Sequence, residues 1–450
     1  MASRLLQIPE RFSPTQLADH VEFALHEATR LGATAAEASL SLGQGLGITV
    51  RKGEIETLEH HRDRGLSITV YQGQRKGSAS TSELTPAGLR ATVNAALGIA
   101  RYTAEDPYAG LAPAELLANS ILDLQLDHPW DLSTAAAIQL AKECEAAALR
   151  DPLITNSEGA SVSIGEALSL YGNTHGFLGG YAGTRHSISC SVIASDAQGL
   201  MERDYWFSTA RYPAALETAE AIGLQAAARA KARLGGQRIP TGQVPVLFAP
   251  EAARSLIGNF LGAIRGSALY RQSSFLVDSL GKNIFPTFVK IHEQPHLLKA
   301  LGSAPFDSEG VATQARTFVE QGILQSYVLN SYSARRLGLI TTANAGGVRN
   351  LQVESTGHSF TDLLRVMNTG LLVTELMGQG VNLVTGDYSR GAAGFWIENG
   401  EIAYPVQEIT IAGQLPLMFQ NIEAIGNDID RRSNVCTGSI LLKSMMIAGE

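Results

Sequence analysis

Three residues in the second half of the chain match the spacing of a zinc protease site. His292, Glu293 and His296 fit the pattern H-E-x-x-H, in which two histidines on one helical face bind zinc and the glutamate is the general base. Pro295 lies inside the motif, where it removes a backbone donor and disfavours a helical Gln294. We therefore interpret the match as a chance one on a loop. A hydrolase that uses these three side chains, or Cys436 with a distant histidine, stays the less favoured alternative.

A second group of polar side chains stands in immediate succession within the glycine-rich stretch Thr374–Trp396. It consists of Asp387, Tyr388, Ser389 and Arg390. Alternating apolar and polar residues before the quartet, and two aromatic residues after it, predict a turn between two strands. Such a turn can present its side chains to a ligand, but the same pattern fits a bend whose charges are merely solvated.

The other candidates are isolated in the sequence. His358 follows a glycine and directly precedes a predicted helix, and Cys436 lies among small residues. A lone histidine is more often a hydrogen-bonded structural residue than a ligand, and a buried cysteine is more often inert than nucleophilic. No Walker loop, G-x-S-x-G elbow or dinucleotide fingerprint occurs in the sequence.

The elements that must position these side chains begin with two units of the same order: helix, antiparallel meander, helix. Ser-Pro and Thr-Pro pairs mark two of the helix starts, and alternation with Lys-Gly and Arg-Gly turns marks the strands. The predicted ranges are 13–32, 35–82 and 85–99 for the first unit, and 133–149, 154–205 and 214–234 for the second. An irregular segment at 103–130 connects them.

The rest of the chain is predicted to be a mostly antiparallel β-sheet or barrel-like domain with few short helices, at about 250–264, 359–368 and 415–424. Two hairpins, 317–324 and 395–402, look alike, and the second has the Asn-Gly of a tight primed turn. The glycine pair at 235–236 predicts domains at 1–234 and 235–450, with a possible subdivision near 103–130. The fold class is therefore α+β.

Composition excludes several classes of protein. The 450 residues are 45% hydrophobic and 17% charged, with a formal net charge of −8. An acidic chain without a basic stripe predicts no nucleic-acid partner. No apolar run approaches the roughly 18 residues that span a membrane, and residues 1–12 lack the apolar core of a signal peptide. With only three scattered cysteines, we expect a protein of the reducing cytoplasm.

Several stretches together resemble the TldD/PmbA family, also called modulators of gyrase, and specifically its PmbA (TldE) branch. The resemblance covers nearly the whole chain. It is carried by residues 65–71, 75–80, 155–159, 172–176, 275–282, 306–310, 345–347, 374–396, 408–413 and 426–428.

The resemblance implies a cytoplasmic two-subunit metalloprotease that acts on unfolded or leader peptides. In that family the TldD subunit carries zinc on H-E-x-x-x-H and a later cysteine. Ungapped placement puts Ile257, Gly258 and Gly262 at the histidine, glutamate and histidine positions, and Cys436 at the cysteine position. Since the first three cannot ligate a metal or move a proton, we expect no cofactor in this chain and zinc in the partner.

The leading hypothesis is thus a non-catalytic subunit that forms walls of a substrate chamber and stabilises a TldD-like zinc subunit. Asp387, Tyr388, Ser389, Arg390 and His358 are the candidates for the chamber wall or the subunit contact. A homodimer is expected to be possible when the chain is isolated. The alternative from another class is a non-enzymatic homodimer that holds peptides without cleaving them.

Overall fold

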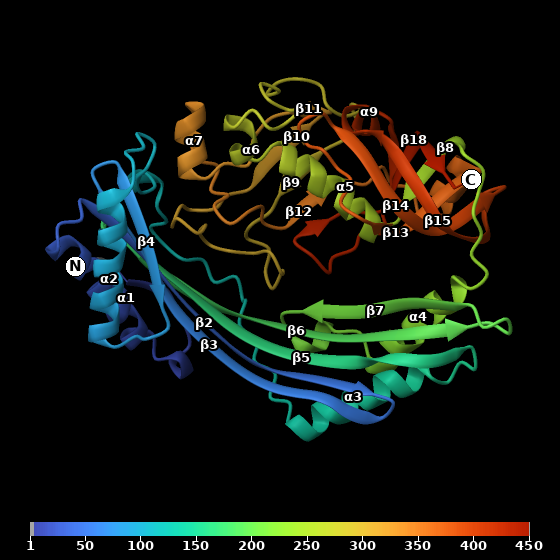
Figure 1. Cartoon of the computed structure of the whole chain (residues 1–450), viewed down its shortest axis with the longest axis horizontal. Helices are drawn as coiled ribbons and strands as arrows, with labels where there is room; N and C mark the ends of the chain where they lie inside the picture. Colours follow the sequence, from blue (N-terminus) through green and yellow to red (C-terminus); the bar gives the residue numbers. More distant parts are fainter. Residues whose placement is uncertain (1–3, 450) are drawn as a thin grey trace.

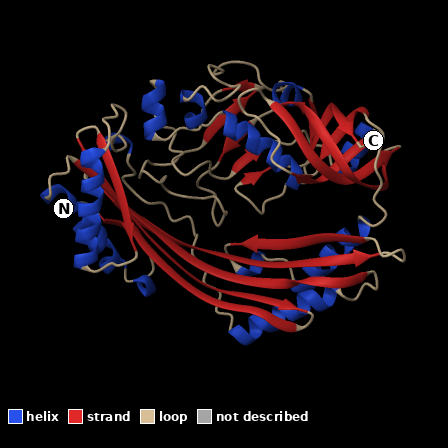
Figure 2. Cartoon of the chain, in the orientation of Figure 1, coloured by secondary structure: helices blue, strands red, loops and turns tan. Residues whose placement is uncertain are grey.

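The computed structural model describes residues 4–449 of the chain (Figure 1). A long, curved sheet lies opposite a second part that contains a β-barrel, and helices and strands are both plentiful (Figure 2). The predicted α+β class is confirmed. No helix among the described residues is long and apolar enough to cross a membrane.

The large sheet contains the strands of both predicted units. Its strands run in the order β1-β6-β5-β2-β3-β4, and β7 pairs with β6. β2 and β5 pair antiparallel from Glu37↔Asn173 to Val50↔Ala160, so the two units share one continuous sheet. The strands are β1 (Arg4–Gln7), β2 (Ala35–Arg51), β3 (Glu54–Gln72), β4 (Arg75–Thr81), β5 (Ile154–Asn173), β6 (Leu178–Ser195) and β7 (Met201–Ala210).

Four helices cover one face of this sheet. Successive side chains of a strand point to opposite faces, and the even-numbered residues of β2 are mostly buried from Ala36 to Val50. α1 (Pro14–Arg30) and α2 (Pro86–Tyr102) pack on the first half of this row, and α3 (Thr134–Ala148) and α4 (Ala219–Ala232) pack on the second. The other face of the sheet is concave and faces the C-terminal part (Figure 1).

Side-chain caps explain where three of these helices begin. The hydroxyls of Thr85, Ser133 and Thr218 each accept a hydrogen bond from the backbone N–H three residues later, which satisfies one of the free donors of a helix start. α4 begins five residues later than predicted because residues 213–215 form a separate 3-10 turn. The 103–130 segment is irregular as predicted, with one 3-10 turn at Ala114–Leu116.

Five strands of the C-terminal part close into a barrel. β8 pairs with both β13 and β18, β14 lies between β13 and β15, and β15 pairs with β18 to complete the ring. Only the β8–β13 pair of this ring is parallel, so the prediction of a mostly antiparallel, barrel-like structure is confirmed. The strands are β8 (Gly242–Phe248), β13 (Gly370–Met377), β14 (Asp387–Glu398), β15 (Glu401–Gln414) and β18 (Ile440–Ala448), with β16 (Ile422–Ile425) beside β18.

A smaller five-stranded sheet and short helices surround the barrel. The sheet contains β9 (Ile291–Glu293), β10 (Arg316–Glu320), β11 (Ile323–Leu324), β12 (Leu351–Val353) and β17 (Val435–Cys436). The helices are α5 (Pro250–Ala263), α6 (Gly266–Tyr270), α7 (Ser331–Leu337), α8 (Phe360–Met367) and α9 (Leu415–Gln420). The helix predicted at 415–424 is wrong after Gln420, because the chain enters β16 at Ile422.

Both predicted hairpins are present. Asn399 and Gly400, between β14 and β15, have φ of 54° and 75°, and Gln321 and Gly322, between β10 and β11, have φ of 50° and 76°. Two consecutive positive φ values are the signature of the type I′ turn, whose twist matches that of paired strands.

The two parts of the molecule are held together beside α7. The Arg335 side chain donates to the carbonyls of Tyr108, Gly110 and Leu111 at 2.7–2.9 Å, and these three lie in the long connection. Phe306 of the C-terminal part packs edge-on against Phe177 beside β6, with ring centres 5.3 Å apart. These contacts fix one end of the space between the sheet and the barrel.

Candidate substrate cleft

Two adjoining hollows lie between the large sheet and the C-terminal part. The first hollow has a volume of about 610 Å³ and is lined by β7, α4, α5, β13 and β14. The second hollow, of about 630 Å³, is lined by the ends of β6 and β7, by α5 and by loops around residues 302, 346 and 433. Phe207 and Arg432 line both, so we call the two hollows together the cleft.

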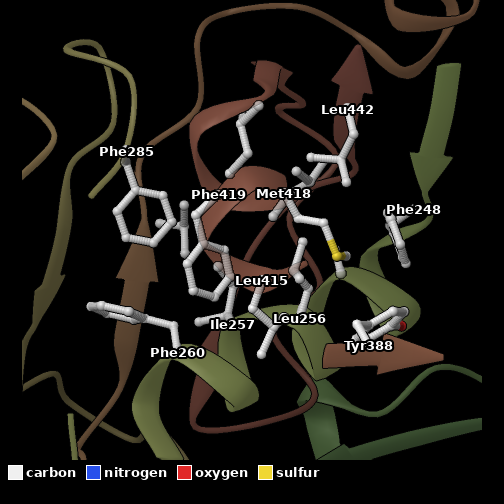
Figure 3. Packing of buried hydrophobic residues seen from close by; sticks show 14 of the residues in the cluster. Phe248, Leu256, Ile257, Phe260, Phe285, Tyr388, Leu415, Met418, Phe419 and Leu442 are labelled. Atoms are coloured by element: carbon white, nitrogen blue, oxygen red, sulfur yellow. The ribbon is translucent and has the colours of Figure 1, made fainter. Parts of the chain in front are cut away.

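Helix α5 separates the barrel core from the cleft. Pro250 at its first turn fits the helix start, where no backbone N–H is needed. Leu256, Ile257 and Phe260 point into the barrel core, where Ile257 is 1% exposed (Figure 3). On its other side α5 presents Glu251 and Ser255 to the first hollow.

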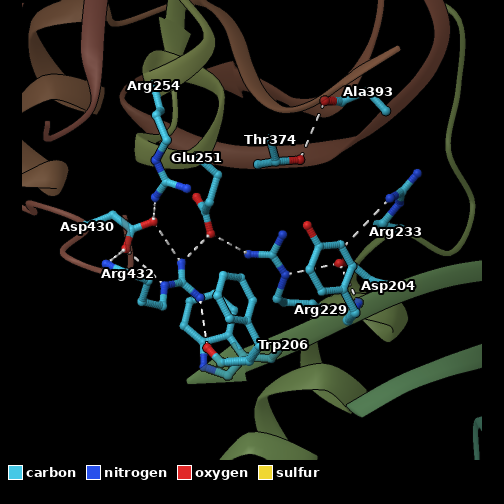
Figure 4. Close-up of polar contacts among 12 residues, drawn as sticks. Asp204, Trp206, Arg229, Arg233, Glu251, Arg254, Thr374, Ala393, Asp430 and Arg432 are labelled. Carbon is cyan, nitrogen blue, oxygen red and sulfur yellow. Dashed lines mark hydrogen bonds and ion pairs between the residues drawn. The ribbon is translucent and has the colours of Figure 1, made fainter. Parts of the chain in front are cut away.

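Arg432 connects three segments at the junction of the hollows. Its Nε donates to Asp430 at 2.9 Å, one Nη donates to Glu251 of α5 at 3.1 Å, and the other donates to the Phe207 carbonyl of β7 at 3.2 Å. Its guanidinium also lies 3.9 Å from the centre of the Trp206 ring, a cation–π contact (Figure 4). The C-terminal part is thereby tied to the edge strand of the large sheet.

The carboxylate at the centre of these contacts is kept charged. Burial alone would raise the pKa of Asp430, but hydrogen bonds from Arg432 and the charges of Arg432 and Arg254 outweigh burial and hold that pKa below its ordinary value. Arg254 of α5 also pairs directly with Asp430.

Helix α4 and the residue that follows its last turn add two more arginines to the wall of the first hollow. Arg229 donates to Asp204 at 3.2 Å and to Glu251 at 3.3 Å, and its guanidinium lies 5.2 Å from the Trp206 ring centre (Figure 4). Arg233 pairs with Glu375 of β13. Acidic and basic side chains thus alternate along this wall, which suits a polar, extended ligand better than an apolar one.

The predicted turn around residues 387–390 is wrong. These residues are the first four of β14, and the turn lies before them, between the end of β13 and Gly386. Glycines at 378 and 386 have positive φ and let the chain reverse early, after which β14 pairs with β15 from Asp387↔Gln414 onward.

As part of a strand, the quartet is divided between two environments. Tyr388 is 1% exposed in the barrel core, where burial raises its pKa to about 12, and Asp387 and Ser389 are exposed. Arg390 alone reaches the first hollow, where it donates to Ser255 of α5 at 2.8 Å. The structure therefore brings one of the four to the cleft.

His358 lies outside both hollows. It precedes α8, as predicted, its Nδ1 is 2.9 Å from the Thr356 hydroxyl, and its backbone pairs with Gly426. α8 packs against the side of the barrel formed by β8 and β18.

The residues of the H-E-x-x-H match do not lie on a helix. His292 and Glu293 are on β9, so their side chains point to opposite faces of a strand. The Glu293 carboxylate is buried and accepts from the Asn344 amide at 3.0 Å and from the Arg349 N–H at 2.8 Å, and the His296 ring bonds Thr313. This geometry removes the hydrolase alternative that relied on these residues.

Comparison with known proteins places the chain in a family. Models described as PmbA/TldA metallopeptidase domain 1, central domain and C-terminal domain match residues 36–100, 127–234 and 241–449. The chain belongs to the PmbA/TldD family. It is 52% identical over 416 residues to the metalloprotease PmbA of Escherichia coli O157:H7, and the match covers 92% of this chain and 92% of that protein. It is 48% identical over 437 residues to the PmbA homolog of Haemophilus influenzae, and that match covers 96% of both chains.

Solved structures share the same fold. A putative modulator of DNA gyrase from Bacteroides thetaiotaomicron superposes with a TM-score of 0.91 at 28% identity, over 96% of this chain and 98% of that one. TldE from Thermococcus kodakarensis, at 18% identity, superposes with a TM-score of 0.82 over 96% and 100%. The PmbA/TldD fold therefore extends over nearly all of the described residues.

The positions at which the PmbA/TldD resemblance places zinc ligands do not fit a metal in this chain. Ile257 has an aliphatic side chain inside the barrel core, and Gly258 and Gly262 have none. The Cys436 thiol lies 3.4 Å from the Ser433 carbonyl, and burial raises its pKa, which opposes the thiolate that a metal needs. Among residues 4–449, no three His, Cys, Asp or Glu side chains are grouped to hold a metal.

The main wall of the cleft was not predicted from sequence in this member of the PmbA/TldD family. Its charged residues come from β7, α4 and the residue after it, α5, β13, β14 and the loop before β17, between 200 and 435. The one local signal is the run Tyr205-Trp206-Phe207, since three aromatic residues after two acids are unusual on an exposed edge strand.

Proposed function

We propose that this chain is the zinc-free subunit of a two-subunit cytoplasmic peptidase that degrades or matures unfolded or leader peptides. In this proposal it forms part of the substrate chamber and stabilises a TldD-like partner. Its relatives are named metalloproteases, and the cleft supplies the surface that such a subunit needs.

The observation that carries the proposal is helix α5. The helix borders the cleft as a catalytic helix would, but positions 257, 258 and 262 offer no imidazole and no carboxylate. The face that holds Ile257 is committed to the core instead. In a mixed complex, zinc bound by the partner would activate water, with a partner glutamate as general base.

Strand β7 supplies a place for the peptide backbone. β7 pairs with β6 on one side, and the Phe207 carbonyl faces the other side, where it accepts from Arg432. Because the N–H and C=O of one strand residue point the same way, residues 203, 205 and 207 direct their backbones away from β6. The Tyr205 N–H already donates to the Asp204 carboxylate at 2.7 Å, so the groups left for a ligand are those of Arg203, the Tyr205 carbonyl and the Phe207 N–H. An extended peptide that adds to this edge would be held by main-chain bonds, which tolerate many sequences.

The test compares the chain alone with the chain co-purified with a TldD-like subunit. We expect the lone chain to hold far less than one zinc per molecule and to leave an unfolded peptide intact, while the mixed complex cleaves it. Stoichiometric zinc together with cleavage in the lone chain would refute the proposal. If size measurements show no mixed complex under any condition, the peptide-holding homodimer becomes the better reading.

A further inference from the structure

The second hollow is unusually rich in arginine. Its lining includes five arginines and no aspartate or glutamate. They are Arg185, Arg211, Arg254, Arg349 and Arg432. Arg254 and Arg432 are neutralised by Asp430 and, for Arg432, also by Glu251.

The remaining three arginines have no ion pair with a carboxylate anywhere in residues 4–449. The Arg185 Nε donates to the Thr209 hydroxyl at 3.2 Å, and the Arg349 guanidinium donates to the carbonyls of Ala345 and Gly347 at 3.3 Å. These partners carry no charge, so neither guanidinium is paired with a carboxylate at the wall of the hollow.

Arg211 is held in place more tightly than the other two. It donates to the carbonyls of Ala300 and Leu301 at 2.8 Å and of Thr184 at 3.2 Å. Burial and the neighbouring charge of Arg185 lower its pKa, with Tyr181 acting in the opposite direction. A partly desolvated and firmly held guanidinium with a second arginine beside it favours the arrival of an anion.

Two glycines let the segments that form the wall of the hollow pack closely beside these arginines. Gly346 has φ of 91°, and a Cβ added there would lie 2.6 Å from the Ser308 hydroxyl and 3.3 Å from an Arg349 Nη. A Cβ on Gly302 would lie 2.8 Å from Asn350 and Asn434. Both glycines line the hollow, and a side chain at either position would collide with the segments that form its wall.

We propose that the second hollow binds a carboxylate group of the peptide in the cleft, either its C-terminal carboxylate or an acidic side chain. Planar guanidiniums pair with carboxylates through two parallel hydrogen bonds. Phe207 of β7 lines both hollows, so a peptide added to the β7 edge would bring a carboxylate within reach of this site. The inference rests on the proposed function, and it adds a preference for acidic or C-terminal segments.

The experiment measures binding of a labelled unstructured peptide to the full chain by fluorescence anisotropy. Four versions of one peptide without other acids are compared: free C-terminal carboxylate, C-terminal amide, amide with one added Glu, and amide with Gln in its place. We expect the wild-type chain to bind at least one carboxylate version about tenfold more tightly than its neutral counterpart. The version that gains affinity identifies the source of the carboxylate.

The test variant is Arg185→Gln, because this exposed side chain holds only one neutral partner. It is expected to remove most of the tenfold preference while leaving affinity for the neutral peptides unchanged. Arg62→Gln is the matched control, since Arg62 is exposed on β3 and lines neither hollow. It should leave the preference intact.

Three results would overturn the inference: equal affinity for acidic and neutral peptides, an unchanged preference in Arg185→Gln, or competition by inorganic phosphate at concentrations where acetate has no effect. None of these results would contradict the proposed function, because its test measures zinc content and peptide cleavage in the lone chain and in the mixed complex. Cleavage by the lone chain would refute the proposed function and leave the carboxylate preference standing.

Discussion

The Arg432 side chain connects several segments of the molecule. It is 14% exposed, its partner Asp430 is 7% exposed, and it contacts α5, β7 and two aromatic rings. A buried charge pair adds little stability compared with an apolar pair, but removal of one partner leaves the other with fewer compensating contacts. Without Arg432, Asp430 would keep only Arg254 and Glu251 would keep only Arg229 as charged partners.

We therefore expect Arg432→Ala to lower the free energy of unfolding by about 3 kcal/mol. Arg432→Lys should lose less, because it keeps the charge and gives up only the forked hydrogen bonds. Urea unfolding measures both. Arg238→Ala, which removes an exposed pair with Glu408, is the control and should change stability by less than about 0.5 kcal/mol. Equal losses in Arg432→Ala and Arg238→Ala would contradict the central role of Arg432.

The same cluster predicts a pH dependence. The pKa of Asp430 is lower in the folded chain than its ordinary value, so its contribution to stability is complete above the ordinary aspartate pKa of about 3.9 and is lost as pH falls through the folded pKa. Unfolding free energies measured from about pH 5 down to pH 3 should fall less steeply in Asp430→Asn than in the wild type. Identical slopes would mean that Asp430 is not held charged by its arginines.

At the scale of elements, α5 has two sides with opposite requirements. Ile257 fills space in the barrel core, whereas a Cβ added at Gly258 would meet nothing within 4 Å. An interior helical glycine costs conformational entropy that alanine does not.

Adjacent substitutions on α5 should therefore change stability in opposite directions. Gly258→Ala is expected to raise the free energy of unfolding by about 0.5–1 kcal/mol, and Ile257→Ala to lower it by about 2–5 kcal/mol. Denaturant unfolding of the two variants measures both changes in the free energy of unfolding. A loss of stability in Gly258→Ala would show that this face of α5 is covered rather than free.

The edge of β7 can be tested with proline. Arg203→Pro removes a backbone N–H that faces the cleft and not β6, and an edge strand tolerates this change. Arg203→Ala is the matched control, because it removes the same side chain and its pair with Glu158 but keeps the N–H. If peptides add to this edge, peptide affinity should fall about tenfold further in the proline variant. Equal affinity of the two variants would exclude β7 as the docking edge.

At the scale of the whole molecule, the cleft exists because the barrel part is held over the concave face of the sheet. Arg335 and Phe306 hold one end, and Arg432 and Arg233 hold the other. Arg390 connects β14 to α5 at the wall of the cleft, so the proposed partner subunit or peptide could contact both elements there.

Arg390→Ala is expected to impair either assembly with a TldD-like subunit or peptide binding by the mixed complex, by about tenfold, because it removes a charged donor from the wall. Size measurement and peptide cleavage separate these two effects. Ser255→Ala keeps the arginine and removes only its partner hydroxyl, so it should have the smaller effect. Normal assembly and activity in Arg390→Ala would mean that the 374–396 stretch has only a structural role.

Sequence patterns predicted most elements but few of their long-range pairings. Helix starts at Thr85 and Ser133 and the turn at Asn399-Gly400 depend on a few neighbouring residues, so local rules suffice for them. The pairing of β2 with β5 joins residues more than a hundred positions apart, and no local pattern specifies such a register. The quartet at 387–390 was misplaced by a few residues, because the glycines that allow the turn are spread from 378 to 386.

The sequence by itself determined the class of fold and the family. It also determined that positions 257, 258 and 262 of α5 cannot bind a metal or move a proton, since isoleucine and glycine have no side-chain atoms that do either. Only the tertiary structure decided which charges meet. Arg185, Arg349 and Arg432 lie in different segments, and they share one hollow because the packed sheet and barrel bring those segments together. Side chains so far apart in the chain become neighbours only when burial of both cores outweighs the entropy of closing the loops between them.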